Sequence, residues 1–326
     1  MDRGTVLVTG GNSGIGLACA RRLAREGWHV VIASRNRDAS AEAVRRIARQ
    51  SGTDAVSELG LDLGSTASVR GLVGEIERRD VPLRALVCNA GLQVSSGLRR
   101  SPDGFELTFA VNHLGHFLLT NLLLARLLAN APARIVIVSS GVHDPTLRTG
   151  MPKASITDLE TLAATGGPRV GEFDGRLAYV NSKLCNLWFT YELVRRIEAA
   201  ALTNDARPLT VNAFDPGLVP GSGLARDYPG VLRFIWNWIL PAAAEALTRL
   251  VPTINPARKS GGALAQLVLD PALVHVSGKY FPSHARWREA PSSDASYDVG
   301  RARALWEESV RMSGLMPGES ALVRTV

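Results

Sequence analysis

The stretch that most limits the fold is an apolar run followed by a glycine-rich turn and a helical pattern. Residues 5–9 have the β-branched, apolar character of a buried strand. Glycines in the turn that follows would let backbone N–H groups approach a pyrophosphate, and a helix N-terminus favours negative charge. We therefore expect this turn to bind the phosphates of a dinucleotide through Gly10, Asn12, Ser13, Gly14, Ile15 and Gly16.

Strand-like and helix-like segments alternate along most of the chain. Further strands are expected at 29–33, in a short run leading to 61–63, and at 83–88, 134–139, 209–214 and 279–281. Helices are expected at 39–50, 65–79, 103–129, 261–268, 301–313 and around Tyr179. This alternation predicts one domain over residues 1–326, with a Rossmann-type, doubly wound, mostly parallel seven-stranded sheet and helices on both faces. Ligands of such sheets bind beyond the carboxyl ends of the strands, where Asn89, Ser140 and Pro216 also lie.

The end of the second expected strand indicates the form of the cofactor. An acidic residue at this position would bind the ribose hydroxyls of NAD, whereas a basic residue accommodates the 2′-phosphate of NADP. The run Ser34-Arg35-Asn36-Arg37 contains no acid before Asp38. The sequence therefore predicts NADP(H), with Arg35 at the phosphate, although an arginine that only caps a loop would give the same pattern.

Tyr179 and Lys183 stand four residues apart, so on a helix both side chains project from one face. A free phenol ionises near pH ~10, and a nearby ammonium lowers that pKa toward the range useful for acid–base catalysis. This pair alone is a weak motif. An apolar stripe is expected beside it on the same helix, formed by Val180, Leu184, Leu187, Tyr191, Val194 and Ile197.

Composition limits the other classes of function. Of 326 residues, 46% are hydrophobic and 21% charged, as in ordinary globular proteins. The net charge is +7, but the arginines are scattered without interleaved aromatics, so we expect no nucleic-acid partner. Three separated cysteines and the absence of a leader pattern favour a cytoplasmic protein. His113 and His116 lack a nearby carboxylate or thiol, so no metal is expected.

Two long segments are candidates for binding elements. Residues 141–176 are rich in Gly, Pro and Thr, as in a binding loop, and residues 218–260 are expected to form a substrate lid. The aromatic run Val231–Leu240 is too short to span a bilayer, which needs about 20 residues. It can cover a hydrophobic substrate, lie in a membrane surface or pack in the core.

Taken in order, these motifs resemble those of the short-chain dehydrogenase/reductase family along nearly the whole chain. The resemblance is carried by Gly10–Gly16, Asp62, Asn89-Ala90-Gly91, Asn112, Ser140, Tyr179 with Lys183, and Pro216-Gly217. It implies that Tyr179 is the general acid/base, that Ser140 orients the substrate oxygen, and that Lys183 binds the nicotinamide ribose. Asn112 would hold a relay water. The other implied cofactor contacts are Asp62, Leu63, Asn89, Ala90, Gly91, Pro216, Gly217 and Ser222, the last in place of the family's usual threonine.

Within the family, the chain most resembles light-dependent protochlorophyllide reductases and retinol dehydrogenases, through residues 87–91, 103–107, 112–119 and 173–186. The resemblance implies an NADPH-dependent oxidoreductase that transfers hydride to or from a carbonyl or alcohol of a bulky hydrophobic substrate. Alternatives are light-dependent reduction of a C=C bond in protochlorophyllide and a noncatalytic NADP(H)-binding sensor or scaffold. Family members are often oligomers through the Tyr179 helix, but the long loops here would also suit a monomer.

Overall fold

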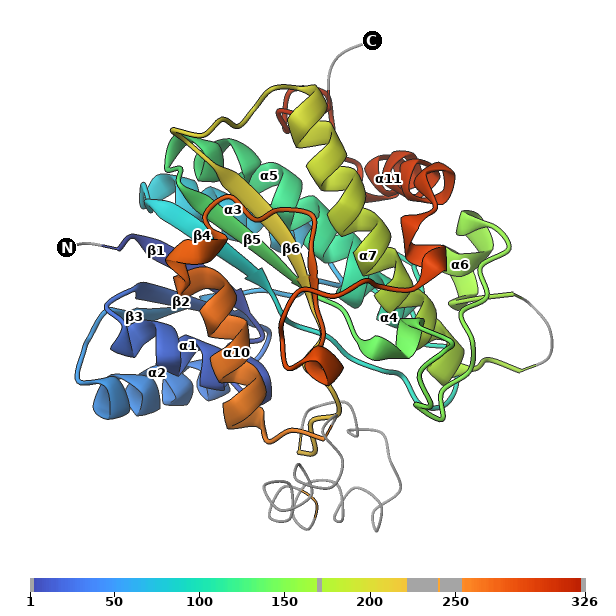
Figure 1. The fold of residues 1–326 in the computed structure, drawn as a ribbon, viewed down its shortest axis with the longest axis horizontal. Helices are drawn as coiled ribbons and strands as arrows, with labels where there is room; N and C mark the ends of the chain where they lie inside the picture. The colour runs from blue at the N-terminus through green and yellow to red at the C-terminus, as the bar shows by residue number, and fades with distance from the viewer. Residues whose placement is uncertain (1–2, 169–171, 222–239, 241–253, 324–326) are drawn as a thin grey trace.

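A seven-stranded sheet forms the centre of the molecule (Figure 1). The computed structural model describes residues 3–168, 172–221, 240 and 254–323. All adjacent strands pair in parallel, in the order β3-β2-β1-β4-β5-β6-β7. They are β1 (Thr5–Thr9), β2 (His29–Ser34), β3 (Val56–Gly60), β4 (Leu83–Cys88), β5 (Ala133–Val138), β6 (Leu209–Phe214) and β7 (Tyr280–Phe281). The predicted doubly wound α/β fold is confirmed, and the strand order reverses between β1 and β4.

Helices cover both faces of the sheet because the strands present apolar side chains to both. Val6 and Val8 point into one core and Leu7 into the other, as the two-residue period of a strand requires. The first core is closed by α1 (Gly14–Arg25), α2 (Arg37–Ser51) and α10 (Ala257–Leu269). The second is closed by α3 (Thr66–Arg78), α5 (Gly115–Ala129) and α7 (Gly175–Ala199).

The helix expected at 103–129 begins later, at Leu107. Glu106 is its N-cap, and the buried carboxylate accepts hydrogen bonds from the Thr108 and Phe109 N–H groups at 2.8 and 2.7 Å. α4 (Leu107–Phe109) continues through a π-helical turn, Ala110–Leu114, into α5. The combined helix, Leu107–Ala129, is long and apolar enough to cross a membrane, but 89% of its most apolar window is buried inside the protein. It is a helix of the protein core.

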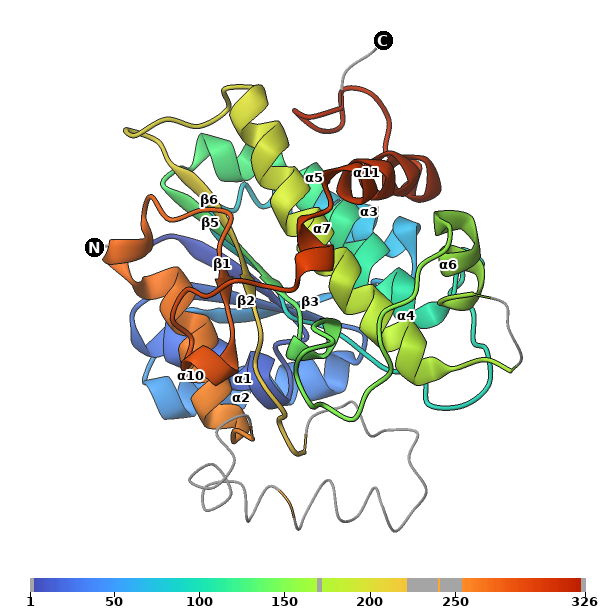
Figure 2. The same cartoon turned by 45° about the vertical axis from the view of Figure 1, so that its right-hand side comes forward.

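α7 is buried on nearly all sides between residues 178 and 193. The sequence predicts a single apolar stripe on this helix, so the buried surface is wider than expected. α11 (Val299–Ser313) covers the outer side of α7 and α5 (Figures 1 and 2). The Trp306 ring packs edge-on against Phe117, with the ring centroids 4.9 Å apart. α6 (Leu159–Thr165) and a 3₁₀ turn at Gly141–His143 interrupt the loop expected at 141–176. Further 3₁₀ turns lie at Pro271–Leu273, Ser283–Ala285 and Asp294–Tyr297.

Apart from Leu240, only the two ends of the expected lid belong to the described part of the chain. Leu218 and Ile254 form a parallel β-bridge, which brings the two ends together. Ser222 and all of the Val231–Leu240 segment except Leu240 lie outside the described residues. The cofactor contact of Ser222 and the role of Val231–Leu240 therefore stay predictions.

Candidate active site

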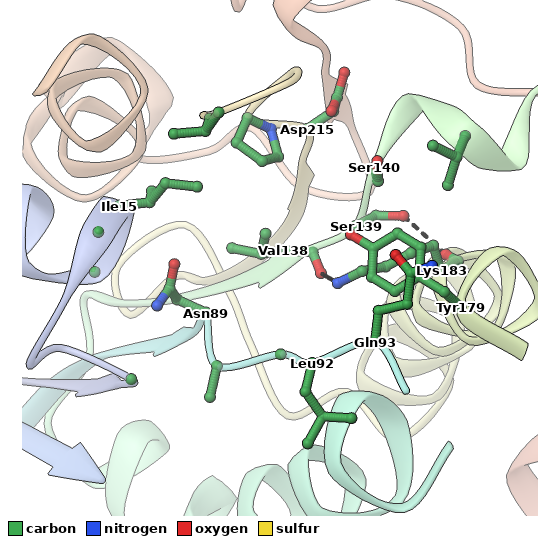
Figure 3. Close-up of a pocket in the computed structure, with 18 of the residues that line it drawn as sticks. Ile15, Asn89, Leu92, Gln93, Val138, Ser139, Ser140, Tyr179, Lys183 and Asp215 are labelled. Carbon is green, nitrogen blue, oxygen red and sulfur yellow. Dashed lines mark hydrogen bonds between the residues drawn. The ribbon is translucent and has the colours of Figure 1, made fainter. Parts of the chain in front are cut away.

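A cavity of about 640 Å³ lies beyond the carboxyl ends of the strands (Figure 3). Turns that follow several strands of the sheet contribute to its walls, as expected at a point where the strand order reverses. The predicted residues that line it are Gly10, Asn12, Ser13, Gly14, Ile15, Gly16, Arg35, Asp62, Leu63, Asn89, Ala90, Gly91, Ser140, Tyr179, Lys183, Pro216 and Gly217. Residues separated by more than half of the chain are thus brought into one site.

The turn between β1 and α1 has the shape that a phosphate group requires. Gly10 and Gly14 adopt φ values of +65° and +53°, which favour glycine. A Cβ atom on Gly16 would lie 2.3 Å from the Gly10 carbonyl oxygen. Ser13, the N-cap of α1, makes no side-chain capping hydrogen bond. The backbone N–H groups at the start of α1 are therefore not capped by that side chain, and they suit a pyrophosphate.

Thr9, at the end of β1, joins this turn to the one that follows β4. Its hydroxyl oxygen accepts hydrogen bonds from the Asn89 and Ala90 N–H groups, both at 2.9 Å. The Asn89 side-chain amide donates to the Thr9 carbonyl at 2.8 Å. His116 Nε2 lies 2.9 Å from the Thr9 hydroxyl, and burial lowers the pKa of His116 to about 4. This neutral histidine is part of the framework that fixes Asn89 and Ala90 at the cavity.

The adenosine end of the cavity carries a cation and no acid at the end of β2. Ser34, Arg35 and Asn36 line the wall, and the Arg35 side chain is exposed to the cavity mouth. Asn36 caps α2 by accepting a hydrogen bond from the Ala39 N–H at 2.9 Å. Asp62 Oδ1 accepts from the Gly64 N–H at 2.9 Å, which orders the turn after β3. These positions suit an adenosine that carries a 2′-phosphate.

Tyr179 and Lys183 lie on the same wall, where α7 meets the end of β5 (Figure 3). Both side chains are almost fully buried. The Lys183 ammonium lies 5.4 Å from the centre of the Tyr179 ring and donates to the Val138 carbonyl at 3.2 Å. Burial lowers the pKa of Lys183 to about 8, against the opposing effect of Asp215. The lysine therefore holds a poorly solvated positive charge beside the phenol.

Ser140 follows the end of β5 and lines the cavity near Tyr179 (Figure 3). The Ser140 carbonyl accepts a hydrogen bond from His143 Nδ1 at 2.6 Å. His143 Nε2 accepts from the Ser293 N–H at 3.3 Å, which places the single ring proton on Nδ1. Burial lowers the pKa of His143 and keeps it neutral. His143 thus fixes the backbone that carries the Ser140 hydroxyl.

Asn112 is the one described member of the predicted catalytic set that does not line the cavity. It lies behind Leu92, on the π-helical turn. Its amide nitrogen donates to the Leu92 carbonyl and the Ser182 hydroxyl, both at 3.0 Å, and its amide oxygen accepts from the Leu92 N–H at 2.8 Å. The side chain therefore holds the turn after Gly91 in place. Its proposed part in holding a water stays a prediction.

The structure adds wall residues that sequence reasoning missed. Those with a polar side chain are Ser34, Asn36, Gln93, Ser139, Arg148, Thr149, Asp215, Ser283 and His284. A signal existed for Asp215, directly before Pro216, and for Ser283 and His284, which follow the end of β7. The Asp215 carboxylate accepts hydrogen bonds from the Gly217 N–H at 2.9 Å and the Ser283 hydroxyl at 3.1 Å. It fixes two turns at the cavity.

The described ranges contain no candidate metal cluster, and their cysteines are buried. No group of three histidine, cysteine, aspartate or glutamate side chains there has the arrangement of a metal site. His113 Nε2 lies 2.9 Å from the Ser309 hydroxyl, inside the core. Cys19, Cys88 and Cys185 are buried, and burial raises the pKa of each thiol, that of Cys88 to about 12. These thiols are small core side chains.

Comparisons with known proteins identify relatives of this chain. Residues 4–149 match the family model for short chain dehydrogenases. The chain is 37% identical to dehydrogenase/reductase SDR family member 13 of Bos taurus, over 97% of this chain and 75% of that protein. It is 35% identical to protochlorophyllide reductase A of Oryza sativa subsp. japonica, over 97% of this chain and 82% of that protein.

Solved structures have the same fold. A crystal structure of an uncharacterised protein from Mycobacterium paratuberculosis superposes with a TM-score of 0.68 at 28% identity, covering 96% of this chain and 94% of that one. A blue fluorescent protein from a metagenomic library, solved in complex with NADPH, gives a TM-score of 0.59 at 22% identity over 86% of this chain and 96% of its own. From the relatives, the motifs and the fold together, the chain belongs to the short-chain dehydrogenase/reductase family of oxidoreductases.

Proposed function

We propose that this protein is an NADPH-dependent oxidoreductase that interconverts a carbonyl group and an alcohol on a bulky hydrophobic substrate. The observation that carries the proposal is that Tyr179, Lys183 and Ser140 share one cavity with the glycine turn of β1. A proton donor, a cation beside it and a dinucleotide cradle are the parts that such a reaction needs.

The residues present suit NADP(H). The uncapped start of α1 would hold the pyrophosphate, and Arg35 would pair with the 2′-phosphate. Asp62 and Leu63 would contact the adenine, and Asn89, Ala90 and Gly91 the ribose next to it. When bound, the cofactor would supply or accept the hydride. Two solved neighbours were crystallised with NADPH, a blue fluorescent protein and an L-sorbose reductase from Gluconobacter frateurii.

The protein's own residues would handle the proton. Ser140 donates a hydrogen bond to the substrate oxygen and fixes its direction. Tyr179 then gives its phenolic proton to that oxygen as negative charge develops there. Lys183 stabilises the phenolate that remains, since its ammonium lies against the tyrosine ring in a site of low solvent access. In the oxidative direction the same groups take the proton away.

The walls favour an apolar substrate. Several of the wall side chains are apolar, as in Leu92, Val142, Leu147, Met151 and Val219. A pocket of this kind selects by shape and apolar area rather than by charge. The expected lid, whose ends Leu218 and Ile254 reach the cavity, would add further apolar surface.

A second candidate is reduction of the C=C bond of protochlorophyllide in light. It is favoured by one observation, the 33–35% identity to several chloroplastic protochlorophyllide reductases over nearly the whole of this chain. A noncatalytic NADP(H) sensor is the weakest of the three readings, because it has no use for the combination of Ser140, Tyr179 and Lys183.

The proposed setting follows from the same features. We propose a cytoplasmic protein that acts on a hydrophobic small molecule and has no nucleic-acid partner. Contact with a membrane surface through residues 231–240 is proposed as an addition to this. It is tested by sedimentation with anionic vesicles, where a protein left wholly in the supernatant at low salt would contradict it.

The direct test is NADPH consumption in the dark against bulky aldehydes and ketones, including a retinoid and a steroid. The proposal predicts turnover, with kcat/KM for NADPH well above that for NADH. An Arg35→Ala variant should lose roughly tenfold or more on NADPH and little on NADH, because one charge-assisted phosphate contact is removed. Turnover of protochlorophyllide in light, with none of the dark substrates accepted, would favour the second candidate.

A further inference from the structure

Gln93 is a polar side chain on the wall of the cavity that the proposed mechanism does not use. It follows the Asn89-Ala90-Gly91 turn and lines the wall, where its side chain extends toward Tyr179 (Figure 3). Only 9% of the residue is exposed. Among the residues that the structure describes, its side-chain amide has no hydrogen-bond partner. Because Gln93 lines the cavity, this unused amide is open to a bound ligand, and a ligand without a polar group there would displace its water and leave it unpaired.

The backbone on both sides of Gln93 is fixed, so its direction is built into the fold. Leu92 is held through its N–H and its carbonyl by the Asn112 side chain, at 2.8 and 3.0 Å. On the other side, Val94 is buried, and its carbonyl lies so close to Gly175 that a Cβ atom there would be 1.7 Å away. Gln93 is therefore presented to the cavity by a rigid turn, as a binding group must be.

We propose that the Gln93 amide binds a second oxygen of the substrate, close to the carbonyl that reacts. Ser140 and Tyr179 are committed to the reacting oxygen, which leaves Gln93 for a neighbouring group. A glutamine amide can donate to a carbonyl and can both donate to and accept from a hydroxyl. The substrate class is then apolar compounds with a dicarbonyl or hydroxy-carbonyl unit. This inference rests on the proposed function, because it assigns the polar end of the same substrate.

Discrimination follows from the cost of leaving the amide unpaired. A substrate with a single oxygen would fill the cavity yet leave Gln93 without a partner, whereas one with two oxygens would satisfy it. Sites built around such a hydrogen bond reject the analogue that lacks it more strongly than purely apolar sites reject a change in size. One neutral hydrogen bond corresponds to roughly a tenfold preference.

The test compares benzil, with two adjacent carbonyls, and deoxybenzoin, the same skeleton with one. The wild type and Gln93→Met are assayed in the dark with NADPH. We expect the benzil-to-deoxybenzoin ratio of kcat/KM to fall about tenfold in Gln93→Met. The greater intrinsic reactivity of benzil cancels when the two proteins are compared. Leu147→Met, a change of similar size in the apolar wall, should leave the ratio as in the wild type. An unchanged ratio in Gln93→Met would overturn the proposal.

Binding provides a readout that does not depend on turnover. Titration calorimetry of the NADP⁺ complex should show hydrobenzoin, a diol, binding about tenfold more tightly than diphenylethanol, and Gln93→Met should remove that difference. Equal affinities in the wild type would overturn the inference even if ketones are reduced. The predicted difference without any turnover would uphold Gln93 and contradict the proposed function. NADPH affinity checks the fold of each variant, and Gln93→Leu, which lacks both donor and acceptor, replaces Gln93→Met if that variant does not bind NADPH.

Discussion

Lys183 shows that single side chains in the cavity are arranged for chemistry at the expense of stability. It is 3% exposed, and within the described part of the chain its ammonium donates one hydrogen bond, to the Val138 carbonyl. The Asn186 side chain donates to the same carbonyl at 3.0 Å. Burying a cation with so little compensation is unfavourable. Asp215 offsets part of that cost. The charge is useful only if it acts on Tyr179 and on a bound cofactor.

Replacing this lysine should therefore stabilise the protein while removing activity. A pKa lowered from 10.5 to about 8 corresponds to roughly 3 kcal/mol at about 1.4 kcal/mol per unit. Below pH about 8 the lysine is charged in both the folded and the unfolded state, so the whole penalty is present. Between pH 8 and 10.5 the folded state releases its proton first, and the penalty fades. Lys183→Met should raise the free energy of unfolding at pH 7 by up to this amount.

Urea unfolding of the wild type and Lys183→Met across this pH range checks the sign. The gain should be largest at neutral pH and shrink as the pH approaches 10. Lys153→Met, at an exposed lysine of the loop before α6, is the matched control and should change the free energy of unfolding by no more than about 0.5 kcal/mol. A Lys183→Met protein that is less stable than the wild type at neutral pH would contradict this account of the buried charge.

At the scale of elements, the turn before α1 is the most constrained part of the site. A Gly16→Ala change would place a Cβ atom 2.3 Å from the Gly10 carbonyl oxygen and 2.5 Å from the Asn89 amide nitrogen. Strand end, turn and helix start would all have to move. A shift of this kind in a binding element costs about 100-fold. We expect Gly16→Ala to lose at least that factor in NADPH affinity, measured by quenching of protein fluorescence.

Gly71→Ala is the control for that change. Gly71 lies in α3, and a Cβ atom there would meet nothing within 4 Å. Alanine is favoured over glycine inside a helix by roughly 0.5–1 kcal/mol. The Gly71→Ala protein should bind NADPH as the wild type does and melt at a slightly higher temperature. Wild-type NADPH affinity in Gly16→Ala would mean that the turn is not the phosphate site.

Elements were predicted best where the local sequence decides the structure. The strands at 83–88 and 209–214 and the cap of α3 at Ser65 were placed correctly, because apolar runs and capping residues act locally. The start of the helix at Leu107 was placed too early, at 103. Asp103 accepts a hydrogen bond from the Thr66 N–H at 2.7 Å instead, a contact between distant segments that the sequence does not show.

The site could be predicted only in part, because only some of its features depend on local sequence. Glycine turns and strand ends identify the cofactor side, since they are local signals. The position of Asn112 behind Leu92, and the exposure of Gln93 to the cavity, depend on how α5 and α7 pack against the turn after β4. The all-round burial of α7 depends on α11, more than a hundred residues further along the chain. Such tertiary contacts override a helical pattern.

At the scale of the whole molecule, α11 covers a surface that would otherwise be free to bind another subunit. Trp306 packs against Phe117 and Phe189 and lies 4.7 Å below the Arg196 guanidinium. The Trp188 ring donates a hydrogen bond to the Ala295 carbonyl at 2.8 Å, which fixes the chain before α11. The outer side of α5 and α7 is therefore closed by the chain itself (Figure 2).

We accordingly expect a monomer in solution. Light scattering after gel filtration should give one species near 34.9 kDa over a wide range of concentrations. Trp306→Ala should lower the free energy of unfolding by about 3–5 kcal/mol, because a large buried ring is lost. A stable species of twice the mass that dissociates in Trp306→Ala would contradict this view of α11 as a cover.

The central claim is that Tyr179 transfers a proton to a substrate oxygen in an NADPH-dependent reaction. The most direct test measures dark NADPH oxidation by the wild type and Tyr179→Phe with the best carbonyl substrate of the panel. Phenylalanine keeps the ring and removes the proton donor. We predict a kcat lower by roughly 10²–10⁴-fold, the usual contribution of a general acid, with NADPH affinity within about threefold of the wild type. Turnover by Tyr179→Phe at the wild-type rate would contradict the account.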